Sequence, residues 1–429
     1  MNFLDRTKQP KVKLIENISL LKPNEHKLDN GILFSYFDGG TQDVIKIECV
    51  FNAGTWFQEK NLVAFSTIKM LTEGTKNHSA AELAEIFDSY GAFVETEAEK
   101  DYSSISLYSL NRHLEKLLPV FIEMIRESVF PFDELSVLME NSKQNHLVSM
   151  QRVNYLARIS FAQQIFGENH PYGKYANLND YDNVTSSDLI SFHKKYYHPG
   201  NLRIIAAGKI NNSSTIELIN KYFGDKTWKN QSETITTNFK INTNPKKSIF
   251  IPKDGALQSG IRIGKILFNK KKPDYLGVFI LNVVLGGYFG SRLMSNIREK
   301  NGYTYGIGSG MISLKNSGYM YIASEVGADV REKALIEIYK EIKGLREKPI
   351  NNEELNLVKN YLIGSFLRSI DGPFALSERF LGLLDYGFDF NEYYNNYILT
   401  IKNITSKQLL ELANTYFAEN SFCETIVGK

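Results

Sequence analysis

The chain has 429 residues, of which 43% are hydrophobic and 23% charged. This is the composition of a soluble globular protein that can bury a large core without a disulfide or metal. Lys and Arg total 50 against 48 for Asp and Glu, so no strong field toward nucleic acid or an anionic membrane is expected. The N-terminus lacks the apolar segment of a signal peptide, and the longest uncharged run, 275–291, is too short to span a membrane. We therefore expect a cytoplasmic protein.

In chain order, the first half alternates predicted strands with predicted helices. Residues 45–51 and 103–110 are rich in β-branched residues or alternate in polarity, which predicts strands. Residues 79–91 begin with a capping box and end at a glycine, and 114–125 have one apolar face, so both ranges predict amphipathic helices. Strands separated by helices in this way predict an α+β fold with helices packed on a mixed or antiparallel sheet.

The second half repeats the order of the first. The segment 188–209 and the segment 408–429 both read as a helix, an aromatic pair, a turn, a β-rich run and a final Gly-Lys, at an offset of 220. The capping-box signal before each helix repeats as well, at Thr185 and Thr405. Because such repeats indicate duplicated structural units, we predict two homologous tandem domains. The alternative that this reading leaves is two unrelated α/β domains.

A polar stretch rich in Asn, Thr and Lys separates the two copies. It covers residues 225–247 and has the composition of a linker. The predicted N-terminal domain is therefore 1–224 and the predicted C-terminal domain is 248–429.

Motifs for chemistry are scarce. None of the seven histidines forms HExxH or HxxEH, and there is no GxSxG or phosphate-binding loop. The most informative stretch is IREKNGYTYGIGSG, in which Arg298 precedes an Asn-Gly turn signal and Tyr305 follows it. A helix end, a turn and a returning strand can bring a guanidinium and a phenol together, and such a pair can hold a carbonyl or a developing oxyanion. From spacing alone, a structural Arg with a packed Tyr remains the simpler interpretation.

The sequence resembles the pitrilysin (insulinase-type, inverzincin) metallopeptidase family over almost its whole length. The resemblance runs through FNAGTWFQEKNLVAF, LTEGTKNHSAAELAEIFDSYGA, FGENHPYGKY and DLISFHKKYYHPGNLRIIAAGKI in the first half, and through LNVVLGGYFGSRLMSNIREKNGYTYGIGSG in the second. It implies a duplicated α/β domain. In the family, a first-half HxxEH motif and a later Glu bind zinc, and a second-half Arg and Tyr bind the substrate; the last two fall on Arg298 and Tyr305.

The zinc ligands of the family are missing here. The two His positions fall on Phe65 and Lys69, the Glu of the motif falls on Ile68, and the later Glu ligand falls on Asn145. Phenylalanine and isoleucine cannot ligate a metal, a neutral amide is a poor replacement for a carboxylate, and an ammonium repels a dication. We therefore expect no zinc bound by this chain, which alone is predicted to be inactive.

The resemblance implies a role beside a partner. In two-chain members of the family, one subunit keeps HxxEH and the other keeps the Arg and Tyr, and this sequence matches the second type. The leading hypothesis is a non-catalytic, substrate-binding subunit of a heterodimeric zinc endopeptidase, whose HxxEH-bearing partner carries the zinc and which acts on short unfolded peptides. The alternative is an inactive peptide-binding or scaffold protein without a peptidase partner, for instance a homodimer. An autonomous hydrolase that uses Ser66 or Thr67 as nucleophile lacks a suitably spaced His or acid.

Overall fold

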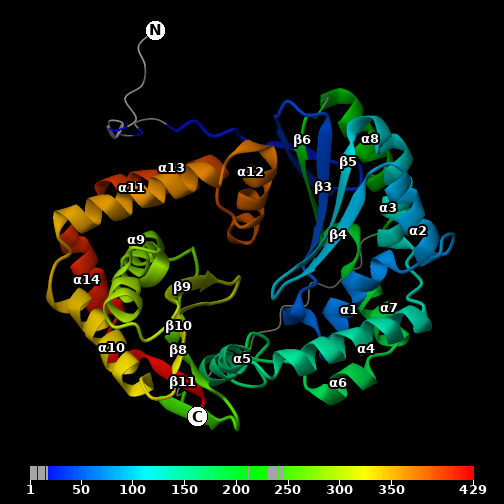
Figure 1. Cartoon of the computed structure of the whole chain (residues 1–429). Coiled ribbons are helices and arrows are strands. Elements are labelled where there is room, and N and C mark those ends of the chain that lie inside the picture. Colours follow the sequence, from blue (N-terminus) through cyan, green and yellow to red (C-terminus); the bar gives the residue numbers. More distant parts are fainter. Residues whose placement is uncertain (1–6, 8–14, 16–17, 211, 230–238, 242–244) are drawn as a thin grey trace.

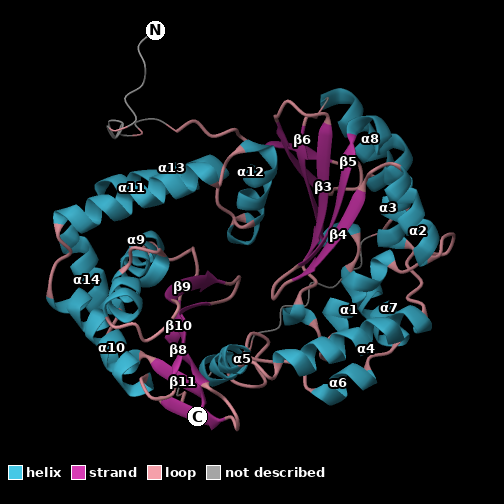
Figure 2. Ribbon diagram, viewed as in Figure 1, coloured by secondary structure: helices cyan, strands magenta, loops and turns pink. Residues whose placement is uncertain are grey.

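The structure is a computed structural model that describes residues 7, 15, 18–210, 212–229, 239–241 and 245–429. The first half of the chain, blue to green, and the second half, green to red, form two bodies of helices and strands around a common centre (Figure 1). In each body a sheet packs with helices (Figure 2). The α+β fold class predicted from the sequence is therefore confirmed.

The described residues form two β-sheets, one from each half of the chain. The first has the strand order β1-β2-β6-β3-β5-β4 and the second has the order β7-β11-β8-β10-β9. The strands are β1 (Asn24–Lys27), β2 (Leu33–Asp38), β3 (Val44–Phe51), β4 (Phe93–Ala98), β5 (Ser103–Leu110), β6 (Leu202–Gly208), β7 (Ser248–Pro252), β8 (Gln258–Leu267), β9 (Ile307–Ser313), β10 (Gly318–Gly327) and β11 (Cys423–Gly428).

Helices and two π-helical segments complete the two bodies. In the first half the α-helices are α1 (Val63–Lys69), α2 (Ala80–Ser89), α3 (Leu114–Arg126), α4 (Phe132–Ser149), α5 (Val153–Phe166), α6 (Leu178–Asn183), α7 (Ser186–Tyr196) and α8 (Asn212–Phe223). In the second half they are α9 (Tyr275–Asn282), α10 (Arg331–Glu347), α11 (Asn352–Arg368), α12 (Gly372–Leu381), α13 (Phe390–Asn403) and α14 (Ser406–Tyr416). The π-helical segments are η5 (Val283–Gly287) and η6 (Met294–Lys300).

Apart from β1, which has no counterpart among the described strands of the second half, the two sheets share one topology, as the sequence repeat predicts. Strands β2 and β6 pair in parallel, and β3, β5 and β4 follow in antiparallel order. Strands β7 and β11 pair in parallel in the same way, and β8, β10 and β9 follow. The side chains of Thr185 and Thr405 cap α7 and α14 in matching capping boxes. The predicted duplication is therefore confirmed at the level of the fold.

Alternation along the strands explains which face of each sheet is buried in its own body. In β3, Ile45, Ile47 and Cys49 point into the core of the first half, beneath α3 and α7, while Lys46 and Glu48 point to the other face. The amphipathic pattern of α3 supplies the opposing apolar surface. The opposite faces of the sheets are left for contacts between the two halves.

Two helices cross from one half of the chain to the sheet of the other. Helix α5, from the first half, packs on β8 and β11, and α12, from the second half, packs on β2 and β6. Phe380 of α12 meets Phe37 of β2 edge-to-face, with ring centroids 5.7 Å apart. The domain boundaries at 224 and 248 stay predictions, and the predicted linker 225–247 lies partly outside the described residues.

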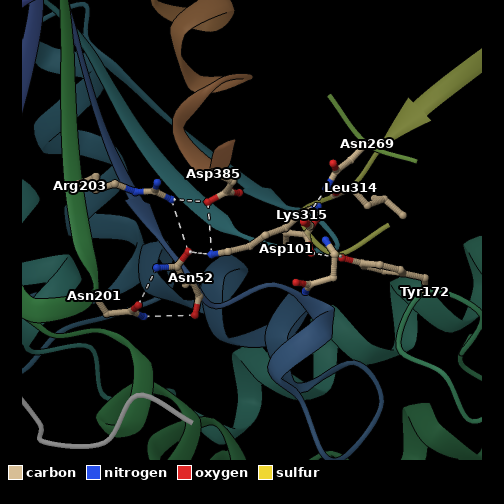
Figure 3. Close-up of polar contacts among 10 residues, drawn as sticks. Asn52, Asp101, Tyr172, Asn201, Arg203, Asn269, Leu314, Lys315 and Asp385 are labelled. Atoms are coloured by element: carbon tan, nitrogen blue, oxygen red, sulfur yellow. Dashed lines mark hydrogen bonds and ion pairs between the residues drawn. The ribbon is translucent and has the colours of Figure 1, made fainter. Parts of the chain in front are cut away.

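A polar network ties the β9–β10 turn to the first half (Figure 3). Lys315 Nζ lies 3.0 Å from Asn52 Oδ1 and 3.4 Å from Asp385 Oδ1, and Asp385 also receives Arg203 Nη2 at 3.0 Å. The backbone N–H of Lys315 donates to Asp101 Oδ2 at 2.9 Å. One carboxylate of the second half, Asp385, thus neutralises a cation from each half.

We predict that Asp385→Asn destabilises the chain by about 2 kcal/mol, because two partly buried cations lose their common counter-ion. Urea unfolding measures the loss. The matched control is Asp43→Asn, because the pair of Asp43 with Lys209 is more than half exposed on both sides and is worth less than about 0.5 kcal/mol. Equal effects of the two substitutions would contradict the proposed importance of the network.

Candidate functional site

The α1 segment holds apolar and cationic side chains where the resemblance places metal ligands. Ile68 is fully buried in the core of the first half, and Phe65 packs half-buried against that core. Lys69 lies at the end of α1 and its Nζ donates to the carbonyl oxygen of Thr96 on β4, at 2.9 Å. The ammonium of Lys69 is therefore bound to the outermost strand of the first sheet.

The fourth position, Asn145, lies exposed on α4. Its neighbour His146 is buried, its Nδ1 is 3.3 Å from the hydroxyl of Tyr155, and burial lowers the pKa of the imidazole. In the described part of the chain, no group of three or more His, Cys, Asp and Glu side chains is arranged to hold a metal ion. The α1 side chains at these positions do not fit zinc. Phe65 and Ile68 carry no donor atom, and Lys69 carries a positive charge.

Ser66 and Thr67, the candidate nucleophiles of the autonomous hydrolase, are both fully buried in α1. The Thr67 hydroxyl donates to the Val63 carbonyl at 2.7 Å within the helix. A substrate bond cannot reach either oxygen in this conformation, so the structure disfavours this hypothesis.

A cavity of about 910 Å³ lies between the first sheet, the end of α1 and helix α12 of the second half. Its wall carries five carboxylates and two ammonium groups. The charged lining residues are Lys46, Glu48, Lys69, Glu73, Glu95, Glu97 and Glu378. The volume suits a stretch of peptide rather than a whole folded protein.

Lys46 and Glu48 form a buried ion pair on the cavity floor, with Nζ and Oε2 3.0 Å apart. Burial alone would lower the pKa of Lys46, but the adjacent Glu48 carboxylate more than offsets it and raises the pKa. Burial, followed by repulsion from Glu99 and Glu48, raises the pKa of Glu97. The cavity therefore presents carboxylates whose charge is only partly balanced.

In the second half, the structure brings Arg298 and Tyr305 together. Arg298 lies in η6, the chain reverses at Gly302 with φ of +65°, and Tyr305 precedes β9. The Arg298 Cζ atom is 5.2 Å from the centroid of the Tyr305 ring and 4.9 Å from that of Phe289. The guanidinium thus lies against two aromatic rings, which limits its conformations.

Both rings are open to solvent, at 91% exposure for Tyr305 and 63% for Phe289. The guanidinium of Arg298 has no hydrogen bond or ion pair with any residue that the structure describes, and the backbone carbonyl of Arg298 accepts from the Gly302 N–H within the turn. Its planar donors and the Tyr305 hydroxyl are therefore available to an external acceptor, such as a carbonyl or a carboxylate.

Sequence reasoning missed Phe289 and the π-helical geometry around it. The glycine-rich run LGGYFGSRL packs closely at Gly286, where a Cβ atom would lie 2.7 Å from the backbone nitrogen of Ser309. The same run places Phe289 beside Arg298. An aromatic residue within a glycine-rich run was the signal available in the sequence.

The chain also matches a known family. The family profile described as "Peptidase M16 inactive domain" matches residues 183–362. "Uncharacterized zinc protease YmxG" of Bacillus subtilis is 27% identical over 309 residues, covering 70% of this chain and 73% of the relative. "Non-peptidase homolog YmxG" of Helicobacter pylori is 22% identical over 326 residues, covering 74% of each.

A solved structure shows the same fold. The peptidase M16 inactive domain from Pseudomonas fluorescens superposes with a TM-score of 0.86 at 23% identity, covering 95% of this chain and 98% of that one. Together with the profile, these findings confirm the resemblance to the pitrilysin-type, or M16, metallopeptidase family, and the part of the chain that matches the profile resembles its inactive domain. The matched range 183–362 includes Arg298 and Tyr305 but none of the four positions where the resemblance places the zinc ligands and the catalytic Glu.

No described helix is long and apolar enough to cross a membrane.

We predict that the purified chain binds zinc far below one ion per molecule, measured by elemental analysis after dialysis against dilute zinc. A double substitution, Phe65→His with Lys69→His, is expected to gain weak zinc binding, because two imidazoles four residues apart share one helix face. Ala81→His with Glu85→His, two exposed positions four residues apart on α2, tests whether any His pair on a helix face suffices. Stoichiometric, chelator-sensitive zinc in the unaltered chain would contradict the prediction.

Proposed function

We propose that this chain is the non-catalytic, substrate-binding subunit of a heterodimeric zinc endopeptidase. The observation that carries the proposal is the contrast between the two halves. The Arg298 guanidinium lies against the exposed ring of Tyr305 and meets no acceptor among the described residues, whereas the α1 positions offer a buried isoleucine and a tethered ammonium in place of metal ligands. A half-site of this kind is useful when a partner chain bearing HxxEH completes it.

In this proposal, zinc in the partner supplies the activated water, and this chain holds the peptide. Arg298 donates to the carbonyl oxygen of the bond to be cleaved or to a nearby carboxylate, using a fork of N–H groups that the two rings hold in place. The Tyr305 hydroxyl donates to the oxygen on which negative charge develops. The contribution of this chain is therefore positioning and electrostatic stabilisation.

Short unfolded peptides are the proposed substrate class. Strand β4 pairs with β5 and lies at the end of the first sheet, so its outer edge can accept an extended peptide. The adjacent cavity of about 910 Å³ provides room for side chains. A folded protein would not fit such a cavity, which favours segments that are already unfolded.

We predict that Tyr305→Phe lowers the turnover of the complex with its partner by roughly 10²- to 10³-fold, because one donor to the developing oxyanion is lost. Steady-state peptide hydrolysis measures the loss, and the zinc content of the complex stays unchanged. Tyr303→Phe, two residues away, is the matched control and is expected to retain activity. Full activity of the Tyr305 variant would refute its role.

The alternative function is an inactive peptide-binding or scaffold protein without a peptidase partner, and the name of the Helicobacter pylori relative, "Non-peptidase homolog", favours it. Affinity purification from native cells discriminates the two functions. We expect a stoichiometric HxxEH-bearing chain among the co-purifying proteins. A stable homodimer without such a chain would favour the scaffold.

A further inference from the structure

A second cationic site forms where α5 packs on the second sheet. Gly260 and Gly264 of β8 allow the close approach, because a Cβ atom there would lie 2.7 Å from the Val153 carbonyl oxygen and 2.8 Å from the Phe161 ring, respectively. Helix α5 therefore runs along β8. Arg262 lies between the two glycines and, because side chains alternate along a strand, on the same face. Its side chain emerges beside α5.

Two further cations reach the same region from other elements. Arg158 is exposed on α5, between the two residues of that helix that touch the glycines. Lys100 lies in the turn between β4 and β5 of the first half. Each cation lies against a tyrosine: Lys100 Nζ is 4.5 Å from the ring centroid of Tyr175, Arg158 Cζ is 5.2 Å from that of Tyr155, and Arg262 Cζ is 5.2 Å from that of Tyr321.

None of the three cations has a hydrogen bond or an ion pair with a residue that the structure describes. The nearest carboxylates are engaged elsewhere or lie to one side. Glu325 accepts from Asn154, and Asp101 accepts from the Tyr172 hydroxyl and from the Lys315 backbone. Glu99 is adjacent to Lys100 in sequence but forms no ion pair with it within the described part of the chain.

Packing brings the elements that carry these cations together. Helix α5, which carries Arg158, packs on β8, which carries Arg262. The Lys100 carbonyl accepts from the Trp56 backbone N–H at 2.8 Å, and Trp56 packs in one cluster with Phe161 of α5 and Tyr321.

Burial lowers the pKa of Lys100 to about 8, with Arg158 adding to the effect and Glu99 and Asp101 opposing it. Burial also lowers the pKa of Arg262, and Arg158 again contributes. Partly buried positive charges that repel one another are costly to a fold unless an anion compensates them.

We propose that Lys100, Arg158 and Arg262 form a binding site for a carboxylate of the peptide, with the surrounding tyrosines contacting the neighbouring side chain. The proposal rests on the proposed function, because the ligand is the peptide that the chain holds. A carboxylate is supplied either by the C-terminus of the peptide or by an acidic side chain. Guanidinium groups bind carboxylates in a planar, two-pronged geometry, and aromatic rings beside them hold apolar groups.

The register of the second sheet relates this site to the Arg298–Tyr305 pair. Arg262 is opposite Ala323 of β10, which is opposite Gly308 of β9. The backbone of Tyr305 is therefore two strand spacings away from that of Arg262 across the sheet and three residues away along the chain that enters β9. These two components give a separation of roughly 14 Å. An extended peptide spans that distance in roughly four residues. The anion site therefore suits a carboxylate about four residues from the carbonyl held by Arg298.

The test measures capture of a short randomised peptide library by the immobilised full-length chain, with mass spectrometry as the readout. The library is made in three forms: without acidic residues and with a free C-terminal carboxylate, the same with an amidated C-terminus, and amidated with one internal Glu. We expect capture of one carboxylate-bearing form to exceed that of the fully neutral form by about ten-fold, which is the value of one charged hydrogen bond. Which form is preferred identifies the source of the carboxylate.

In Arg158→Gln with Arg262→Gln, the preference for carboxylate-bearing peptides is expected to fall to near unity. Arg158→Gln alone, at an exposed helix position, is expected to reduce it in part and cannot be attributed to misfolding. Arg112→Gln, on the far side of the first half, is the matched control and keeps the preference. The thermal midpoint of the double variant is expected to be no lower than that of the unaltered chain, because two uncompensated charges are removed.

The possible outcomes separate the two proposals. Capture with a carboxylate preference that the variants abolish supports the anion site. Capture of all three forms equally overturns the anion site while leaving the peptide-binding function standing. A preference that survives the double substitution also overturns it, since the carboxylate then binds elsewhere. Absence of capture of any form contradicts both proposals.

Discussion

The packing of α5 on a glycine-bearing strand is the contact on which the arrangement of this protein depends. Without Cβ atoms at Gly260 and Gly264, a helix of the first half can lie directly on the sheet of the second half. Helix α12 makes the reciprocal contact on the first sheet. Each half thus contributes one helix to the core of the other, so the two halves cannot separate without exposing apolar surface.

This crossed packing also explains why the functional groups lie where they do. The cavity is lined from both halves, since α12 closes it from the side opposite α1. The cation cluster likewise combines Lys100, from the β4–β5 turn of the first half, with Arg262 of the second sheet. The geometry of a site shared between the two halves depends on their relative position. The ion pairs of Asp385 with Arg203 and Lys315 help to hold that position.

Much of the fold could be predicted from the sequence because local signals and the repeat agreed. The capping box at Ser79, the apolar face of α3 and the matching caps at Thr185 and Thr405 each determine a helix through contacts within a few residues. The spacing likewise indicated that Arg298 and Tyr305 can meet, since one turn joins their elements, but a structural Arg with a packed Tyr was the simpler interpretation and the role of the pair came only from the resemblance. The crossing of α5 and α12 depends on contacts far apart in sequence. Nothing in the periodicity of either helix indicates which sheet it covers.

The candidate sites also differ in whether local sequence signals or long-range contacts determine them. Phe289, the buried Lys46–Glu48 pair and the Lys100–Arg158–Arg262 cluster are assembled from separate elements, and single residues of these types in a sequence are indistinguishable from ordinary surface residues. The substitutions at Phe65, Ile68 and Lys69 could be recognised only against the pattern of a family. Their surroundings, such as the Thr96 carbonyl that receives Lys69, required the structure.

The full burial of Ile68 limits what a single substitution at this position could achieve. A glutamate there would place a carboxylate inside an apolar core, and such a group costs several kcal/mol or remains protonated. One replacement would therefore not create a working acid-base group at residue 68. A metal centre in α1 would require coordinated changes in packing as well as in ligands, because this side chain is part of the core of the first half.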